Sequence, residues 1–268
     1  MILNKFVFNY TSRTSRFYLI PIGDIHLGNR GCDIAELRRL IQWVKDNKDV
    51  YWIGMGDYCD CINYTDPRFD PQTVDDKYSS VHLDKNIQLQ TEDFIHLIRP
   101  IADKCLGLHR GNHEEEIRRR YIWDIMHEVH KEYPGIKMLE DTAITRLMFH
   151  RRRHTVGIDV FSQHGRVGGM KGGNKINRLE DMIGYIDADI YLMAHAHIKT
   201  TEMKTQLFMN GKMHLCKRKI ILGVTGSFLR GYMDGNSSYV EKAMLPPTDL
   251  GVIKITITPD SGDIHVSI

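Results

Sequence analysis

Ile-Pro-Ile-Gly-Asp-Ile-His-Leu-Gly, residues 20–28, is the stretch from which the organisation of the chain can be worked out. An apolar run, 17–22, ends at Gly23 and is followed by Asp24 and His26, two side chains of metal-ligand type with one residue between them. A short apolar run bounded by glycine is typical of a buried strand, and residues at i and i+2 project to the same side of a strand. The stretch therefore predicts a strand that presents a carboxylate and an imidazole together at its end.

The next segment completes a strand–helix–strand unit. Asp33 and Glu36 stand in capping-box positions, and the apolar residues of 34–47 recur at helical spacing. A second apolar run, 50–55, ends in Gly-Asp-Tyr-Cys-Asp at 56–60. Two strands joined by a helix predict a parallel sheet with helices packed on it.

Apolar periodicity assigns the other elements. We expect helices over about 83–101, 114–132 and 176–186, and an edge strand over 2–10. Further strands are expected at 104–109, 143–149, 155–163, 190–194, 200–209, 212–216, 219–225, 251–257 and 263–267. Because the chain contains no internal repeat, low-complexity tract or linker, we expect one domain over residues 1–268, of the α/β (α+β) class.

Composition restricts the class of protein more than its function. Hydrophobic content of 42% and charged content of 26% are ordinary globular values, and a net charge of +2 gives no global basic field of the kind that marks a nucleic-acid-binding domain. The five cysteines are scattered without Cys-x-x-Cys spacing, as in reduced cytosolic proteins. The sequence shows no signal-peptide core and no run of the ~20 apolar residues that span a bilayer. We therefore expect a soluble, cytoplasmic protein with no membrane partner.

Five predicted strands end in polar clusters. The clusters are Asp24/His26, Asp57/Asp60, Asn112/His113, His164 and His195/His197. Ligands bind outside the carboxyl ends of strands in open α/β sheets, so the clusters are expected to meet in one crevice. Taken singly, His164 could be a structural histidine, Asp57 a turn residue and Asn112 a helix N-cap. Repetition at the same structural position five times favours a metal site.

The ordered motifs Asp-x-His, Gly-Asp-x-x-Asp, Gly-Asn-His-Glu, His-Gly and His-x-His resemble the calcineurin-like metallophosphoesterase superfamily, over 24–197. The resemblance implies a two-layered mixed β-sandwich flanked by helices. It also implies two divalent metal ions, the first held by Asp24, His26 and His197, the second by Asn112, His164 and His195, with Asp57 bridging them. His113 would contact the substrate phosphate or the leaving group, and Asp60 would orient it.

Phosphoester hydrolysis explains these ligand types. Two metals about 3.5–4 Å apart activate a bridging hydroxide and clamp the attacking and leaving oxygens. Mixed imidazole, carboxylate and amide donors suit Mn, Fe or Zn; manganese is the first choice, with Fe, Zn or Ni as alternatives. If His113 is paired with Asp60, it is suited to act as a general acid. The alternative for His113 is a solvent-facing residue at a helix start.

Cys61 bears on the substrate class. The local motifs resemble those of Ser/Thr phosphoprotein phosphatases, which carry an arginine directly after the second aspartate; Cys61 cannot supply its bidentate hydrogen bonds. Loss of this clamp favours a phosphodiester, and we expect a nuclease-like activity on DNA or another nucleotide. The alternatives are a phosphomonoesterase and a non-catalytic scaffold, which metal analysis would separate.

The glycine-rich segment 165–175 follows His164. With Arg166, Lys171 and Lys175 it could grip a nucleic-acid backbone, or it could be a flexible surface loop. The run 151–153 (Arg-Arg-Arg) is interpreted as a solvated hairpin tip rather than a DNA contact. The part of the chain from His164 to His197 also resembles phage and prophage metallophosphoesterases, which would place the protein in a host cytoplasm. We expect 61–80, 165–175 and 230–239 to form the crevice walls.

Overall fold

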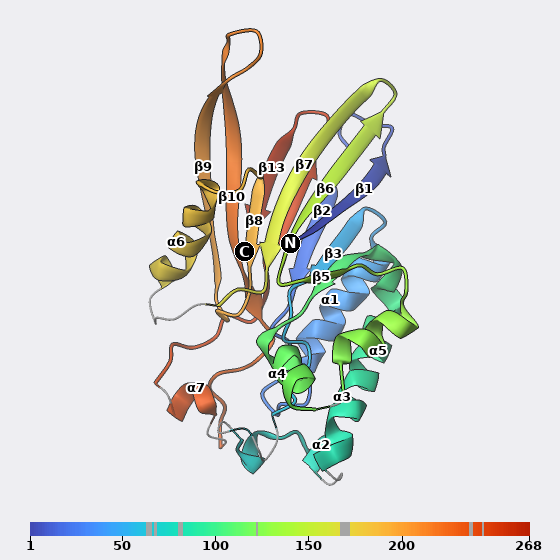
Figure 1. Ribbon diagram of the computed structural model, residues 1–268, viewed down its shortest axis with the longest axis vertical. Helices are drawn as coiled ribbons and strands as arrows, with labels where there is room; N and C mark the ends of the chain where they lie inside the picture. The colour runs from blue at the N-terminus through green and yellow to red at the C-terminus, as the bar shows by residue number, and fades with distance from the viewer. Residues whose placement is uncertain are drawn as a thin grey trace.

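Two β-sheets lie face to face in the computed structural model, with helices on both outer faces (Figure 1). The structure describes residues 1–62, 66, 69–79, 83–121, 123–166, 172–235, 238–242 and 244–268. The predicted two-layered, mixed sandwich flanked by helices is confirmed. Among the described residues, no helix has the length and apolar character needed to cross a membrane.

The first sheet has the strand order β1-β6-β7-β8-β10-β11, with β9 paired to β10. Its strands are β1 (Ile2–Asn9), β6 (Thr142–Arg151), β7 (His154–Gln163), β8 (Ile190–Met193), β9 (Lys199–Met209), β10 (Leu215–Ser227) and β11 (Gly251–Val252). β1 lies at the edge, as predicted, and β7, β8 and β10 run parallel. β9 and β10 extend beyond the rest of the sheet as a long hairpin (Figure 1).

The second sheet has the order β13-β12-β2-β3-β4-β5. Its strands are β2 (Phe17–Ile22), β3 (Val50–Gly54), β4 (Cys105–His109), β5 (Met138–Glu140), β12 (Lys254–Thr258) and β13 (Asp263–Ser267). β2 to β5 are parallel, as the strand–helix–strand pattern predicts. The carboxyl ends of these strands therefore lie at one edge of the sheet.

Helices cover the outer faces of both sheets. α1 (Ile34–Asp46), α3 (Leu83–Ile98) and α5 (Ile125–Glu132) cover the second sheet, and α6 (Gly172–Ile183) covers the first (Figure 1). The short elements are α2 (Asp76–Ser79), α4 (Asn112–Arg120), α7 (Tyr239–Lys242) and the 3₁₀ helices η1 (Pro71–Thr73) and η2 (Arg99–Lys104). Three apolar layers result, one between the sheets and one under each set of helices.

Several predicted elements differ in the structure. The strand expected at 251–257 is two strands, β11 and β12, which belong to different sheets. The helix expected over 114–132 is two helices, because the Asp124 carboxylate accepts hydrogen bonds from the N–H groups of Met126 and His127 and begins α5 there. The helix expected over 83–101 continues past Ile98 as the 3₁₀ helix η2. The strands expected at 212–216 and 219–225 are one strand, β10.

His109 joins the two sheets in the interior. Its ring Nδ1 donates to the Glu140 carbonyl (2.8 Å), and its Nε2 accepts from the Ser162 hydroxyl (2.8 Å). Ser162 belongs to β7 of the first sheet, whereas His109 and Glu140 belong to the second. Burial lowers the pKa of His109 to about 4, so the neutral ring holds this position.

Candidate metal centre

The predicted ligands lie in loops that directly follow strands of both sheets. Asp24 and His26 follow β2, Asp57 follows β3, and Asn112 begins α4 just after β4. His164 follows β7, and His195 and His197 follow β8. Five of these residues have left-handed backbone, with φ of 48° at Asp24, 53° at His26, 52° at Asp57, 65° at His195 and 53° at His197.

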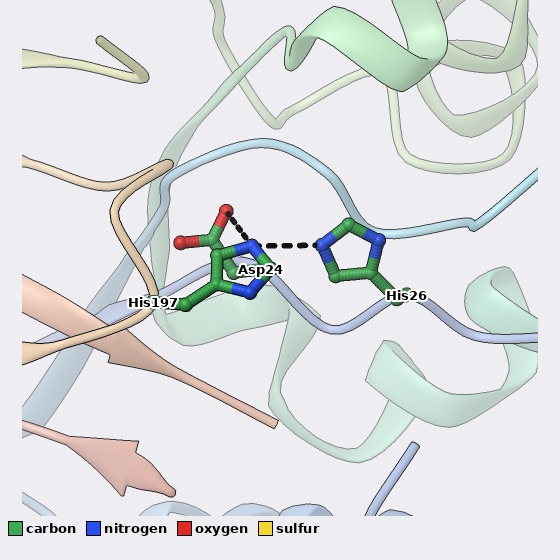
Figure 2. Close-up of side chains that lie close together, drawn as sticks. All are labelled: Asp24, His26 and His197. Carbon is green, nitrogen blue, oxygen red and sulfur yellow. Dashed lines mark hydrogen bonds and ion pairs between the residues drawn. The ribbon is translucent and has the colours of Figure 1, made fainter. Parts of the chain in front are cut away.

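Asp24, His26 and His197 form the first group of donor atoms, which lie within 4.8 Å of one another (Figure 2). His26 Nε2 lies 3.1 Å from His197 Nε2, and His197 Nε2 lies 3.8 Å from Asp24 Oδ1. The loop after β2 and the loop after β8, in different sheets, therefore meet at this point.

Asp57, His164 and His195 form the second group, again within 4.8 Å. His164 Nε2 is 3.2 Å from Asp57 Oδ2, 3.2 Å from His195 Nδ1 and 3.0 Å from Asn112 Oδ1. The four side chains predicted around the second metal thus converge on one ring nitrogen. The two groups are adjacent, because the backbone N–H groups of Ile25 and His26 donate to the Asp57 carbonyl.

Hydrogen bonds on the far side of two imidazoles select the nitrogen that faces the site. His26 Nδ1 donates to Asp60 Oδ1 (3.1 Å), and His164 Nδ1 donates to the Met55 carbonyl (2.7 Å). Because Nδ1 is engaged in each ring, Nε2 is the nitrogen that faces the site and would bind an ion. This arrangement is common for histidines that bind metals.

Asp24 gives the most direct test of whether a cation fits. Its side chain is fully buried, and neither carboxylate oxygen has a hydrogen-bond partner among the described residues. Burial raises its pKa to about 7, against the opposing effect of His164. The backbone N–H of His195 and the His197 ring, 3.8 Å away, offset this burial only in part, and a buried carboxylate with so few donors is unfavourable unless a cation lies against it. The donor set of carboxylate, imidazole and amide therefore fits a divalent ion of the Mn, Fe, Ni or Zn type.

The contact between His113 and Asp60 differs from the prediction. His113 Nδ1 donates to the backbone carbonyl of Asp60, whereas the Asp60 carboxylate binds His26 Nδ1 and Asn29 Nδ2 (3.2 Å). Asp60 therefore orients a predicted metal ligand with its side chain and His113 with its main chain. His113 is buried and lines the cavity described below.

Sequence reasoning missed Glu114. Its fully buried carboxylate accepts hydrogen bonds from the N–H groups of Asp57 (2.9 Å), Tyr58 (2.8 Å), Cys59 (3.2 Å) and Gly111 (2.9 Å). Glu114 thereby holds the loop that carries Asp57 against the start of α4. Its place directly after Asn112 and His113 was the only signal in the sequence.

A cavity of about 710 Å³ opens above the donor atoms. His26, Asp57, Asn112, His195 and His197 lie at its base. Described residues from two excursions also line it, and both excursions overlap the predicted wall segments 61–80 and 230–239. These residues are Ile62, Phe69, Asp70, Pro71, Thr73, Leu229, Arg230, Ser238, Val240, Lys242, Leu245, Pro246, Pro247 and Thr248.

The three predicted substrate-binding cations have different positions. Lys175 lines the cavity, with Nζ donating to the Ala196 carbonyl (3.0 Å). Arg166 is exposed and is not among the described residues that line the cavity. Lys171 lies outside the described residues.

The chain matches no family model and no curated protein sequence. Among solved structures it is similar to a metallophosphoesterase from Sphaerobacter thermophilus, at 10% identity over 93% of this chain and 87% of that chain, with a TM-score of 0.41. It is also similar to a conserved uncharacterized protein, described as a predicted phosphoesterase, from Streptococcus pneumoniae TIGR4 (12% identity, 91% and 84% covered, TM-score 0.37). A third is Vps29 from Chaetomium thermophilum (12% identity, 94% and 93% covered, TM-score 0.38). The donor geometry of the chain itself is therefore the basis for its function.

Proposed function

We propose that this chain is a hydrolase of phosphoesters that works with two divalent metal ions and cleaves phosphodiesters of nucleotides, nucleic acid among them. The observation that carries the proposal is the pair of adjacent donor groups at the strand ends, one of which contains the buried Asp24 carboxylate, whose only ion-pair contact among the described residues is His197 at 3.8 Å. We assign Asp24, His26 and His197 to one ion and Asn112, His164 and His195 to the other, with Asp57 between them.

Different residues around the site would hold the metal ions and donate a proton during hydrolysis. Two bound divalent ions would neutralise charge on the phosphoryl oxygens and lower the pKa of a water molecule. We assign His113 as the proton donor to the leaving group. Because its Nδ1 donates to the Asp60 carbonyl, Nε2 is the ring atom that can pass a proton to a substrate in the cavity.

The surroundings of Cys61 support a phosphodiester over a monoester. Cys61 is buried, and both its N–H (2.9 Å) and its Sγ (3.3 Å) contact Gln90 Oε1. The position after Asp60 therefore contributes no cation to the site. A phosphodiester carries one negative charge fewer than a monoester dianion and needs this cation less.

Manganese is the proposed metal, because the donor set mixes imidazole with oxygen ligands. Fe, Zn and Ni are the alternatives that metal analysis would identify. We further propose a cytoplasmic location, in keeping with the cysteines, all of which are free thiols. A host cytoplasm, if the gene is phage-borne, stays a prediction.

The test combines metal analysis with a pair of substrates. We expect the purified protein to bind two equivalents of Mn²⁺ and to hydrolyse bis-p-nitrophenyl phosphate faster than p-nitrophenyl phosphate. His113→Ala should lower kcat about 10²- to 10⁴-fold, the usual contribution of a general acid, while Mn²⁺ binding persists. Asp57→Asn should lower both kcat and Mn²⁺ binding. His96→Ala, at an exposed histidine of α3, is the matched control.

Three outcomes would contradict the proposal. Faster hydrolysis of the monoester would indicate a phosphomonoesterase. Failure to bind metal, with no hydrolysis, would indicate a scaffold. Equal activity of His113→Ala and wild type would remove the assignment of His113.

A further inference from the structure

The cavity above the donor atoms is lined by a set of apolar side chains in addition to its polar ones. We call the wall formed by Phe69, Leu229, Val240, Leu245, Pro246 and Pro247 the apolar wall. Phe69 comes from the excursion between β3 and α3, and the other five come from the excursion between β10 and β11. Pockets of about 300–1,000 Å³ with mainly apolar walls are typical sites for small organic groups, and the 710 Å³ of this cavity falls in that range.

Both excursions are fixed to one loop, 28–33, so their relative position is defined. Arg30 N donates to the Thr73 carbonyl (2.8 Å), and Asp75 N donates to the Gly28 carbonyl (3.0 Å). On the other side, Arg230 N donates to the Gly31 carbonyl (2.9 Å). An ion pair between Lys242 of α7 and Asp70 joins the two excursions directly.

The cations around the cavity already have protein partners. Lys175 donates to the Ala196 carbonyl, Arg230 pairs with Asp33 (2.6 Å), and Lys242 pairs with Asp70. Binding of a nucleic-acid duplex depends on a row of Lys and Arg side chains that neutralise successive phosphates. The described residues that line the cavity offer no such row.

The hydroxyl groups of the threonine and serine side chains beside the apolar wall already form hydrogen bonds within the protein. Thr73 Oγ1 donates to the Asp70 carbonyl (2.8 Å), and Thr248 Oγ1 donates to the Leu229 carbonyl (2.6 Å). Ser238 Oγ donates to the Gly231 carbonyl. The wall therefore presents apolar surface and few donors, which favours recognition by contact area over recognition of a particular hydrogen-bonding edge.

We propose that the apolar wall binds the nucleoside of the substrate, with the base packed against Phe69 and Leu245 and with little discrimination between bases. This inference rests on the proposed function, because it takes the phosphate to lie at the metal donors. Stacking of a base on an aromatic side chain is sequence-tolerant, since every base has a π-face. The nucleoside can belong to a small nucleotide or to the end of a single strand, since a cavity of about 710 Å³ is of the size that holds one nucleotide-sized group.

Ligand binding tests the apolar wall independently of catalysis. Thymidine 5′-monophosphate and methyl phosphate carry the same phosphate group, and their dissociation constants are measured by calorimetry on the Mn²⁺-loaded protein. We expect the nucleotide to bind at least about tenfold more tightly. Phe69→Ala and Leu245→Ala should each reduce this ratio about fivefold or more, the fold-change that corresponds to the lower range for loss of one stacked base. Leu207→Ala, at an exposed leucine of the β9–β10 hairpin, is the control.

The inference would be overturned if the wild type bound thymidine 5′-monophosphate and methyl phosphate with nearly equal dissociation constants. It would also be overturned if the ratio of these constants were the same in Phe69→Ala, Leu245→Ala and wild type. If bis-p-nitrophenyl phosphate is then still hydrolysed, the proposed function stands without the apolar wall. If the nucleotide binds more tightly as expected but bis-p-nitrophenyl phosphate is not hydrolysed, nucleoside binding by the apolar wall is supported and the proposed function is contradicted. Replacing thymine by adenine should change the dissociation constant less than about fivefold; a larger change would overturn the tolerance for bases.

Cleavage of three substrates identifies the source of the nucleoside. A dinucleotide, a 20-nucleotide single strand and the corresponding duplex are compared under Mn²⁺. Preference for the dinucleotide supports a small nucleotide as substrate, and preference for the single strand supports a strand end. Cleavage of the duplex as fast as the single strand would overturn the inference.

Discussion

Left-handed backbone is concentrated at the predicted ligands. Asp24, His26, Asp57, His195 and His197 all have φ near +50° to +65°, a region that costs a residue with a side chain roughly 1–2 kcal/mol. Such conformations cluster at functional sites, where the surrounding structure maintains them. The chain thus keeps carboxylate and imidazole donors at positions where the backbone conformation itself favours glycine.

His197 allows this cost to be measured. In the metal-free protein, we expect His197→Gly to be more stable to urea than His197→Ala by about 1 kcal/mol, because glycine adopts positive φ without strain. Both variants should lose one equivalent of bound metal. The same pair at His96, inside α3, should show the opposite order, since alanine favours a helix. Equal stability of the two His197 variants would show that the backbone there is unstrained.

His109 predicts a pH dependence of folding. Its pKa is about 4 in the folded protein because of burial, against an ordinary value of 6.5, so the unfolded chain takes up a proton first as the pH falls. The contribution of the neutral His109 ring to the free energy of unfolding is fully present above pH 6.5 and is lost as the pH falls towards 4. The loss amounts to about 3 kcal/mol. Urea unfolding at pH 7 and pH 5 should show a smaller loss of stability for His109→Gln than for the wild type. A His96→Gln control shows whether loss of any imidazole has the same effect, and equal losses in wild type and His109→Gln would contradict the assignment.

At the scale of elements, the loop after β3 depends on α4. Gly111 packs so closely against this loop that a Cβ there would lie 2.1 Å from the Asp57 nitrogen. The Glu114 carboxylate accepts three N–H groups of the loop across the same contact, and a fourth from Gly111 on its own side. The position of the Asp57 carboxylate is therefore set by the start of a helix more than 50 residues further along the chain.

Glu114→Gln tests this dependence. The amide of glutamine would place N–H donors against backbone N–H donors, so we expect a loss of about 1–3 kcal/mol in the free energy of unfolding. Mn²⁺ affinity should fall about 10- to 100-fold, as for other residues that orient metal ligands. Isothermal titration and urea unfolding measure the two effects, with Glu116→Gln on the same helix as control. Unchanged Mn²⁺ affinity would leave Glu114 a purely structural residue.

The elements were predictable where a local pattern determines them. The spacing of Leu37, Ile41 and Val44 identifies α1, and the apolar run of β2 ending at Gly23 identifies a strand. The break between α4 and α5 was missed, because it depends on Asp124, which caps α5 while also binding the Arg110 guanidinium (2.9 and 3.0 Å). Arg151 likewise pairs with Asp260, 109 residues away, and contributes to tertiary structure as well as to a hairpin tip.

At the scale of the whole molecule, the sequence predicted which strand ends converge and which segments lie around them, but not how those segments are positioned or that they present apolar side chains to the cavity. The donor residues follow strands, and the direction of parallel strands places their ends together. The walls come from the excursions around Phe69 and Leu245, whose positions depend on hydrogen bonds to the loop 28–33. The hydrogen bond between the Asp60 carboxylate and His26 was likewise not predicted, because the two residues lie 34 positions apart in the sequence.

Both sheets contribute to each donor group, and this predicts how metal removal affects the molecule. Asp24, His26 and Asp57 follow strands of the second sheet, whereas His164, His195 and His197 follow strands of the first. Ions held between them would join the sheets at one end, as His109 and Ser162 do in the interior.

Because a ligand that binds only the folded state stabilises it by mass action, Mn²⁺ at 100 times its Kd should add about 2.7 kcal/mol per site. We therefore expect chelation with EDTA to lower Tm and to reduce amide-exchange protection at the carboxyl ends of β2, β3, β7 and β8 together. Asp24→Asn should remove part of the Mn²⁺-dependent rise in Tm, and Asp103→Asn, at an exposed residue of η2, should retain it. Loss of protection confined to one sheet would show that the ions do not join the two layers.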